Sequence, residues 1–153
     1  MTQMDDDQES KDRLRLWIRI LRVSRLIEAE LRELLKSEFD TTLPRFDVMS
    51  ALSRVSEGML MSDLSRFLLV SNGNVTGIVD RLVQDGLVIR SQREGDRRTS
   101  IVSLTPQGRD LFARMAEIHE GWINKAMAGV PSHEAKHLAD TLKAFRSNWE
   151  VDK

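Results

Sequence analysis

A stretch of 27 residues, 11–37, contains neither glycine nor proline. Its apolar side chains recur every three or four positions, which predicts one amphipathic helix of about seven turns. Such a helix is longer than a small domain needs to cover its own core, so we expect it to make contacts beyond its own protomer. The apolar residues that set this spacing are Leu14, Trp17, Ile18, Leu21, Ile27, Leu31, Leu34 and Leu35.

Composition excludes several classes of protein. The chain has 153 residues and a net charge of only −1, so any contact with nucleic acid must come from a local cluster of charge. Cysteine is absent, which excludes disulfides, thiolate metal sites and thiol redox sensing. The acidic start, 1–9, is unlike a signal peptide, and no apolar run reaches membrane-spanning length. We therefore expect a cytoplasmic protein.

Two short helices joined by a turn are predicted after a helix that covers about 43–57. Ser62 caps the first of the two, and Ser71 or Asn72 can cap the second. Gly86 lies at the predicted end of the second helix, where a residue in the left-handed backbone conformation is favoured. This arrangement is typical of a helix-turn-helix. The second helix has one apolar stripe, formed by Val75, Ile78, Val79 and Leu82.

The opposite face of that second helix has side chains that suit DNA. Asparagine can pair with adenine through two hydrogen bonds, and threonine can contact thymine. Two glycines in a helix cost about 1 kcal/mol each relative to alanine, which is understandable if the groove floor must come close. The alternative is a poorly formed, solvent-exposed helix. The residues concerned are Asn72, Gly73, Asn74, Thr76 and Gly77.

A hairpin with an arginine-rich tip is predicted next. Short β-branched runs at 87–92 and 99–104 flank the polar segment 93–98. Between 81 and 109 there are six arginines and three acidic residues, a net charge of +3, so the remainder of the chain carries −4. Arginine suits phosphates and narrow minor grooves. By itself the tip could be an ordinary solvated hairpin, but beside the helix it predicts a DNA-binding wing. Residues 62–104 therefore predict a winged helix-turn-helix that reads duplex DNA.

Two more helices are predicted after the hairpin, and a disordered tail is predicted before the first helix. Thr105-Pro106 starts a helix that runs to about Met127. Residues 129–132 interrupt this helix, and a last helix follows. At the other end of the chain, the acidic residues 1–10 are predicted to be disordered. One face of the last helix carries Leu138, Leu142, Phe145 and Trp149.

Three groups of motifs occur in a fixed order: Met61-Ser62-Asp63-Leu64; Val79-Asp80-Arg81-Leu82 followed by Asp85-Gly86-Leu87-Val88; and Gly95-Asp96-Arg97-Arg98 leading into Val102-Ser103-Leu104-Thr105-Pro106-Gln107-Gly108. In this set the chain resembles the MarR family of winged-helix regulators, from Arg13 to Trp149. The resemblance implies that Asp96 helps to hold the wing and that Arg98 enters the minor groove.

The resemblance also implies an architecture and an activity. The fold is expected to be mainly α with a small β wing, as a single domain over 11–153. In it, 11–42 and 105–150 form dimerisation helices and 43–104 the winged helix-turn-helix. The expected function is a homodimeric, ligand-responsive regulator, as a rule a repressor, on a pseudo-palindromic operator of double-stranded DNA. The DNA-binding residues are expected to be Ser62, Ser71, Asn72, Asn74, Thr76, Arg81, Arg93, Arg97 and Arg98.

The effector is expected to be a small aromatic molecule. Residues 43–47 and 70–77 are similar to those of regulators of aromatic-acid catabolism, including regulators that respond to hydroxycinnamoyl-coenzyme A thioesters. Binding of an aromatic acid or its coenzyme A thioester would then cause the protein to dissociate from its operator. Side chains that could line its pocket, or else belong to the ordinary core, are Trp17, Arg45, Met49 and Trp122.

Two other functions are weighed against this one. His133 and His137 match the H-E-x-x-H pattern of zinc proteases, but a catalytic site needs a third ligand, and the only other histidine is His119. A polar helix start is therefore the expected role of this motif, with a metal-responsive regulator as an alternative. A winged helix that binds protein instead of DNA is the other alternative. With no phosphate-binding glycine loop, hydrolase elbow or nucleophilic cysteine, the sequence predicts no enzyme, no metal and no cofactor.

Overall fold

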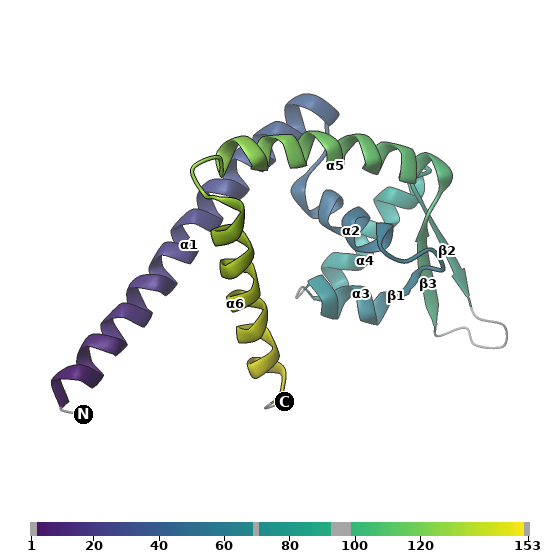
Figure 1. Cartoon of the computed structure of the whole chain (residues 1–153). Helices are drawn as coiled ribbons and strands as arrows, with labels where there is room; N and C mark the ends of the chain where they lie inside the picture. The colour runs from purple at the N-terminus through teal and green to yellow at the C-terminus, as the bar shows by residue number, and fades with distance from the viewer. Residues whose placement is uncertain (1–2, 69–70, 93–98, 152–153) are drawn as a thin grey trace. The chain divides into compact units, whose positions relative to one another are not determined.

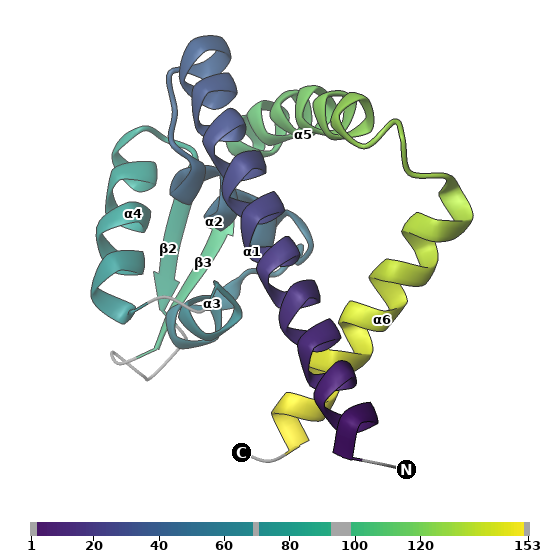
Figure 2. The ribbon, with the colours of Figure 1, turned by 90° about the vertical axis from the view of Figure 1, so that its left-hand side faces the viewer.

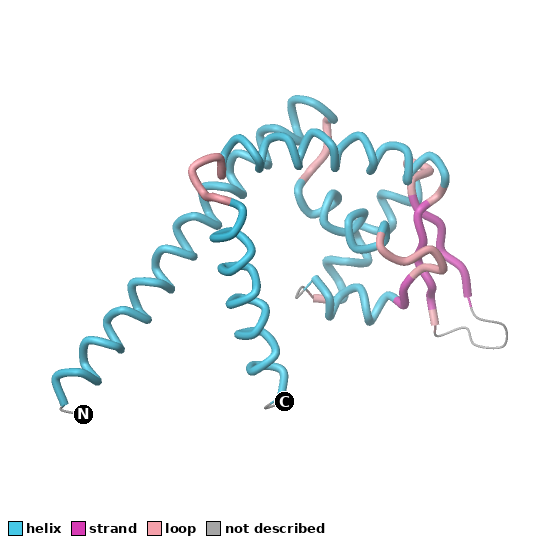
Figure 3. Tube along the Cα trace, in the orientation of Figure 1, coloured by secondary structure: helices cyan, strands magenta, loops and turns pink. Residues whose placement is uncertain are grey.

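The structure, a computed structural model, describes residues 3–68, 71–92 and 99–151, and at 3, 72 and 146–151 only the backbone. The described part is mainly helical with one small sheet, which confirms the predicted fold class (Figures 1 and 3). The chain forms two compact units, Met1–Met115 and Ala116–Lys153. The elements are α1 (Gln3–Phe39), α2 (Leu43–Ser53), β1 (Met59–Leu60), α3 (Met61–Leu68), α4 (Asn72–Gln84), β2 (Val88–Gln92), β3 (Ser100–Leu104), α5 (Pro106–Ala126) and α6 (Ser132–Val151).

Helix α1 is longer than predicted, because the acidic segment expected to be a disordered tail is helical from Gln3. Acidic side chains in the first turn of a helix are stabilised by its dipole. Ion pairs one turn apart add to this, with 2.6 Å between Lys11 Nζ and an Asp7 carboxylate oxygen and 2.9 Å between Arg13 and Glu9. The prediction ignored these pairs because it judged the segment only by its lack of apolar residues.

The sheet is antiparallel in the order β1-β3-β2, with α4 beside β2 (Figure 2). Val88 pairs with Leu104 at one end of the hairpin and Gln92 with Ser100 at the other, so the predicted hairpin is confirmed. Strand β1 was not predicted, because two residues are too short to show an alternating pattern. It pairs with β3 directly after Gly58, whose φ is +86°.

The core of the first unit lies under α4. The predicted stripe of α4 is buried at Val75, Val79 and Leu82, each with an exposed fraction of 0%, while Ile78 is half-buried. This stripe contributes to a core that also includes Leu52 and Leu64, and α4 is in contact with both α2 and α3. Burial of these aliphatic side chains therefore holds α4 by one side and leaves its other side exposed.

Capping residues set the ends of the helices around α4. Ser71 caps α4 by accepting a hydrogen bond from the backbone N–H of Asn74 at 3.4 Å. Gly86 follows with a φ of +73°, as predicted for a left-handed end. The Thr105 hydroxyl donates to the Gly86 carbonyl at 2.7 Å and accepts the N–H of Gly108 at 3.0 Å. One side chain therefore joins the end of α4 to the start of α5.

The second unit contains the end of α5, the break at 127–131 and α6. The break is the predicted one, although α5 ends at Ala126. The apolar residues of α6 are exposed at Leu138, Leu142 and Phe145. In the described segments, no helix is both long enough and apolar enough to cross a membrane.

Candidate nucleic-acid interface

The exposed face of α4 is polar and has little side-chain bulk. Gly73, Asn74 and Gly77 are exposed, and Thr76 is half-buried. An added Cβ at either glycine would meet no atom within 4 Å. No packing reason therefore requires these glycines in the described structure. What they give the molecule is a smooth surface on which another molecule can come close to the backbone.

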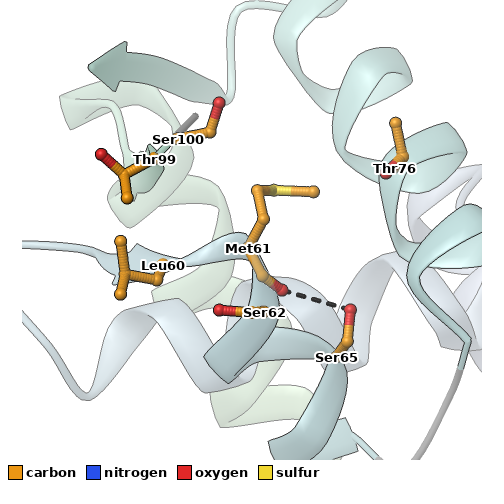
Figure 4. Close-up of a pocket in the computed structure, with 7 residues that line it drawn as sticks. All are labelled: Leu60, Met61, Ser62, Ser65, Thr76, Thr99 and Ser100. Carbon is orange, nitrogen blue, oxygen red and sulfur yellow. Dashed lines mark hydrogen bonds between the residues drawn. The ribbon is translucent and has the colours of Figure 1, made fainter. Parts of the chain in front are cut away.

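A cavity of about 240 Å³ lies between the start of α3, α4 and β3 (Figure 4). It brings two of the predicted DNA-binding residues, Ser62 and Thr76, to one site. The Ser65 hydroxyl donates to the Met61 carbonyl at 3.1 Å, and the side chain of Met61 points toward the side of the cavity where Thr76 lies. The cavity is lined mainly by hydroxyl groups, from Ser62, Ser65, Thr76, Thr99 and Ser100, together with Leu60 and Met61.

A second cavity, of about 700 Å³, lies on another side of α4. It places Asn74 and Arg81, both predicted to bind DNA, beside Arg45 of α2. The Arg45 guanidinium forms an ion pair with Asp85, and its buried Nε has no hydrogen-bond partner among the described residues. The full lining is Asp40, Thr41, Thr42, Pro44, Arg45, Gly73, Asn74, Gly77, Ile78 and Arg81.

Some of the arginines counted for DNA have partners inside the protein. Arg90 of β2 forms an ion pair with Asp80 of α4 at 2.6 Å, and Arg109 donates to the Ser56 carbonyl at 3.5 Å. Arg90 therefore connects strand β2 to α4. Sequence reasoning missed this role because it treated the cluster as one net charge, although Asp80 also stands near Arg90 in the sequence.

The tip of the wing lies outside the described residues. This applies to Arg93, Asp96, Arg97 and Arg98, and also to the side chain of Asn72. The strands before and after this segment, β2 and β3, are paired. The roles of these residues stay predictions.

The four predicted pocket residues have different surroundings. Only Arg45 lines the larger cavity. Met49 is 1% exposed and belongs to the core, which was the alternative interpretation. Trp17 is exposed on α1, and Trp122 is half-buried on α5 within the second unit.

The histidines of the H-E-x-x-H motif lie on the first two turns of α6. Both His133 and His137 are exposed, and Glu134 lies in the first turn, where the helix dipole favours an acid. In the part of the chain that the structure describes, no three potential ligands come together around a metal site. His119 is half-buried on α5, and burial lowers its pKa.

Two helices only three residues apart in the chain, α3 and α4, with an exposed polar face on α4 and two paired strands after it, define a winged helix-turn-helix protein of the DNA-binding class. A model described as the MarR family matches residues 41–100. A solved structure of a MarR family transcriptional regulator from Silicibacter pomeroyi is 30% identical, with a TM-score of 0.70, and the match covers 95% of this chain and 98% of that one. The chain belongs to the MarR family of transcriptional regulators.

Two further relatives extend this comparison. The transcriptional activatory protein BadR of Rhodopseudomonas palustris is 34% identical over 105 residues, which are 67% of this chain and 59% of that protein. The organohalide-sensing regulator RdhR-CbdbA1625 was solved with 2,4-dichlorophenol bound. It is 25% identical, with a TM-score of 0.74, over 87% of this chain and 78% of that one. These relatives are regulators and not enzymes, as predicted.

Proposed function

We propose that this chain is a homodimeric repressor that binds a pseudo-palindromic operator and releases it when a small aromatic anion binds. The observation that carries the proposal is the position of the larger cavity. Its lining includes residues of the exposed side of α4, the side that we assign to DNA, and two arginines, Arg45 and Arg81. A ligand in this cavity would therefore compete with DNA for one surface.

DNA reading is assigned to the exposed side of the helix-turn-helix. The amides of Asn72 and Asn74 and the hydroxyl of Thr76 contact base edges in the major groove. Arg98 enters the minor groove. The contacts that hold the protein on phosphates come from Ser62, Ser71, Arg81, Arg93 and Arg97.

Dimer formation is supported by the apolar surface that the helices leave exposed. Leu14, Trp17 and Ile18 of α1 are each about half exposed, and α6 exposes a comparable row. Surfaces of this kind on several helices are typical of a protein–protein interface. A twofold dimer would place two recognition helices on half-sites about one turn of DNA apart.

The ligand class is inferred from the chemistry of the cavity. Arginine pairs with carboxylate or phosphate through parallel hydrogen bonds, and the buried Nε of Arg45 is a donor with no described partner. Ile78 and Pro44 add apolar surface for a ring. An aromatic acid fits these features, and a coenzyme A thioester would add phosphates for Arg81. The dichlorophenol bound by RdhR-CbdbA1625 supports the choice of an aromatic ring.

Binding of fluorescent duplexes from the chain's own promoter region tests the DNA assignment. Asn74→Ala should weaken specific binding about tenfold or more and leave nonspecific binding nearly unchanged, because it removes a base contact. Arg81→Gln should weaken both and reduce the dependence on salt. Arg114→Gln, at an exposed position of α5, is the control. Unchanged affinity in the first two variants would contradict the assignment, and a reporter with the operator intact or deleted separates repression from activation.

Calorimetry with aromatic acids and their coenzyme A thioesters tests the ligand. Arg45→Gln should abolish binding, whereas Asp85→Asn breaks the same ion pair but keeps the guanidinium and should still bind. Loss of binding in both variants would mean that the ion pair supports the fold of the site. Normal binding in Arg45→Gln would exclude this cavity.

A further inference from the structure

The methionines of this chain lie in different environments. Met49 and Met115 belong to the core, each with an exposed fraction of 1%. Met4 and Met127 lie on the surface, where they are 83% and 42% exposed. Met61 is half-buried at the start of α3 and lines the cavity of about 240 Å³ beside α4. Met61 is therefore accessible to small molecules in solvent and also lies next to residues that we assign to DNA.

The surroundings of the Met61 side chain are polar, although a thioether is nearly apolar. The side chain extends toward the side of the cavity where Thr76 lies, and Ser62 and Ser65 line the cavity from the same helix (Figure 4). Of the seven described residues that line the cavity, five carry a hydroxyl group. A thioether sulfur is only a weak hydrogen-bond acceptor. The cavity therefore contains hydroxyl groups from which the reduced side chain gains little.

We propose that Met61 is a modification site, at which hydrogen peroxide or a related two-electron oxidant forms methionine sulfoxide and weakens operator binding. A lone pair of the sulfur attacks one peroxide oxygen, the O–O bond breaks and an S–O bond forms. The proton on the transferred oxygen passes to the departing hydroxide, which leaves as water. Sulfur is thus oxidised by two electrons, and the peroxide is reduced. This inference rests on the proposed function, because the DNA-binding role of this surface is part of that proposal.

The sulfoxide acts on DNA binding through the hydroxyl groups around it. Oxidation turns an apolar side chain into a polar one, and its new oxygen is a hydrogen-bond acceptor with partial negative charge. This oxygen competes for the hydroxyl hydrogens of Ser62 and Thr76, which the proposed function assigns to a phosphate and to a base edge. Its partial charge also repels a phosphate held at Ser62. Both effects oppose the approach of DNA.

The fold should tolerate this change at Met61 but not in the core. A hydroxyl group rotates to suit a new acceptor, and five of them line this cavity, so the added oxygen finds donors there. In the core, by contrast, a sulfoxide at Met49 or Met115 would be a buried polar group, which is costly without a hydrogen bond. Their burial also keeps dissolved oxidant away. Mild oxidation should therefore change DNA binding before it changes stability.

Mild treatment of the native chain with hydrogen peroxide tests the proposal. Peptide mass spectrometry should find Met61 oxidised together with the exposed Met4 and Met127. Met49 and Met115 should stay reduced. Affinity for fluorescent duplexes from the chain's own promoter region should then fall about tenfold, because hydroxyl contacts to DNA are lost, while Tm stays nearly unchanged. Methionine sulfoxide reductases of both stereochemical types should restore the affinity, since one enzyme reduces each sulfoxide epimer.

Two variants separate Met61 from a neighbouring methionine. Met61→Leu keeps an apolar side chain of similar volume that peroxide does not oxidise, so its operator affinity should be the same before and after treatment. Met59→Leu is the matched control. Met59 is also half-buried, but it is not among the described residues that line the cavity, so this variant should lose affinity on treatment as the native chain does.

Several results would overturn the proposal. One is an unchanged operator affinity when Met61 is fully oxidised, and another is an equal loss of affinity in Met61→Leu. Met61 that stays reduced while Met127 is oxidised would overturn it too, as would a loss of affinity that only accompanies unfolding. An untreated chain that binds no duplex would overturn the proposed function as well. Specific binding that is indifferent to oxidation of Met61 would overturn only the inference made here.

Discussion

Glycines in two regions of the winged helix serve opposite purposes. At the joint between the sheet and α5, a Cβ on Gly108 would lie 2.0 Å from the Leu87 carbonyl oxygen. Just before β1, a Cβ on Gly58 would lie 2.6 Å from the carbonyl oxygen of Val102 in β3. On α4, Gly73 and Gly77 face open space. The first pair allows backbones to touch within the protein, and the second keeps a surface clear for another molecule. The same residue type therefore serves close packing in one region and, in the other, lies on the exposed side of α4 that we propose as the recognition face for DNA.

The largest effect is expected at the joint. Gly108→Ala should destabilise the chain by about 3 kcal/mol or more, because the new methyl group overlaps a backbone carbonyl that cannot move independently. Gly121→Ala in the same helix, where an added Cβ meets nothing within 4 Å, should instead be neutral or stabilising. Urea unfolding of both variants measures the difference. Equal stabilities would show that the joint has room for a methyl group.

A smaller loss of stability is expected when the Thr105 hydroxyl at the same joint is removed. Thr105→Val keeps the shape of the side chain but removes its hydrogen bonds to Gly86 and Gly108, at a cost of about 1–2 kcal/mol. Thr141→Val is the control, because its hydroxyl donates only to the exposed His137 carbonyl within α6. Thermal unfolding should separate the two variants by several degrees, and matching transitions would contradict the capping role of Thr105.

The recognition face should respond in the opposite way. Gly77→Ala is expected to stabilise the free protein by up to about 1 kcal/mol through helix propensity. It should also weaken operator binding about fivefold, because the methyl group occupies the approach surface. Gly121→Ala provides the same gain in helix propensity away from that surface and should leave DNA affinity unchanged. A Gly77→Ala variant that binds DNA as tightly as the native chain would remove the functional explanation for this glycine.

The smallest expected effect concerns charge at the junction of α1 and α2. Asp47 is still partly exposed, but loss of water around its carboxyl raises its pKa, and the negative charge of Glu28 raises it further. The folded chain thus holds this proton more tightly than the unfolded chain does. Stability is therefore lost as pH rises from the ordinary pKa through the raised one, and the penalty persists at neutral pH.

Asp47→Asn removes that penalty. The variant should be more stable than the native chain at pH 7 by less than about 0.5 kcal/mol, because solvent screens the remaining charge. The advantage should disappear near pH 3, where Asp47 is protonated in both states. Urea unfolding at the two pH values measures the difference in stability between the variant and the native chain. A difference of equal size at both pH values would point to a cause other than titration of Asp47.

Sequence patterns predicted the parts of the fold that are determined by residues close together in the sequence. The stripe of Val75, Val79 and Leu82 and the left-handed residue Gly86 were sufficient to place α4. Contacts between distant residues could not be predicted in this way. Strand β1 exists because Gly58 lets the chain approach β3, and the core position of Met49 depends on how α2 packs. The larger cavity was only partly anticipated, through Arg45, because it forms where the start of α2 meets α4.

The two arginines that bond within the protein change how many counterions the operator can release. The DNA-binding constant of a dimer falls as salt is added, and the slope of its logarithm against the logarithm of salt concentration reflects the number of phosphate contacts. If all six arginines between 81 and 109 in each protomer bound phosphates, this slope would be about −11. Arg90 is held by Asp80, Arg109 donates to Ser56 and Arg98 is assigned to the minor groove, so three arginines per protomer remain for phosphates, with a slope of about −5. The internal ties thus make operator binding less sensitive to ionic strength than the composition suggests.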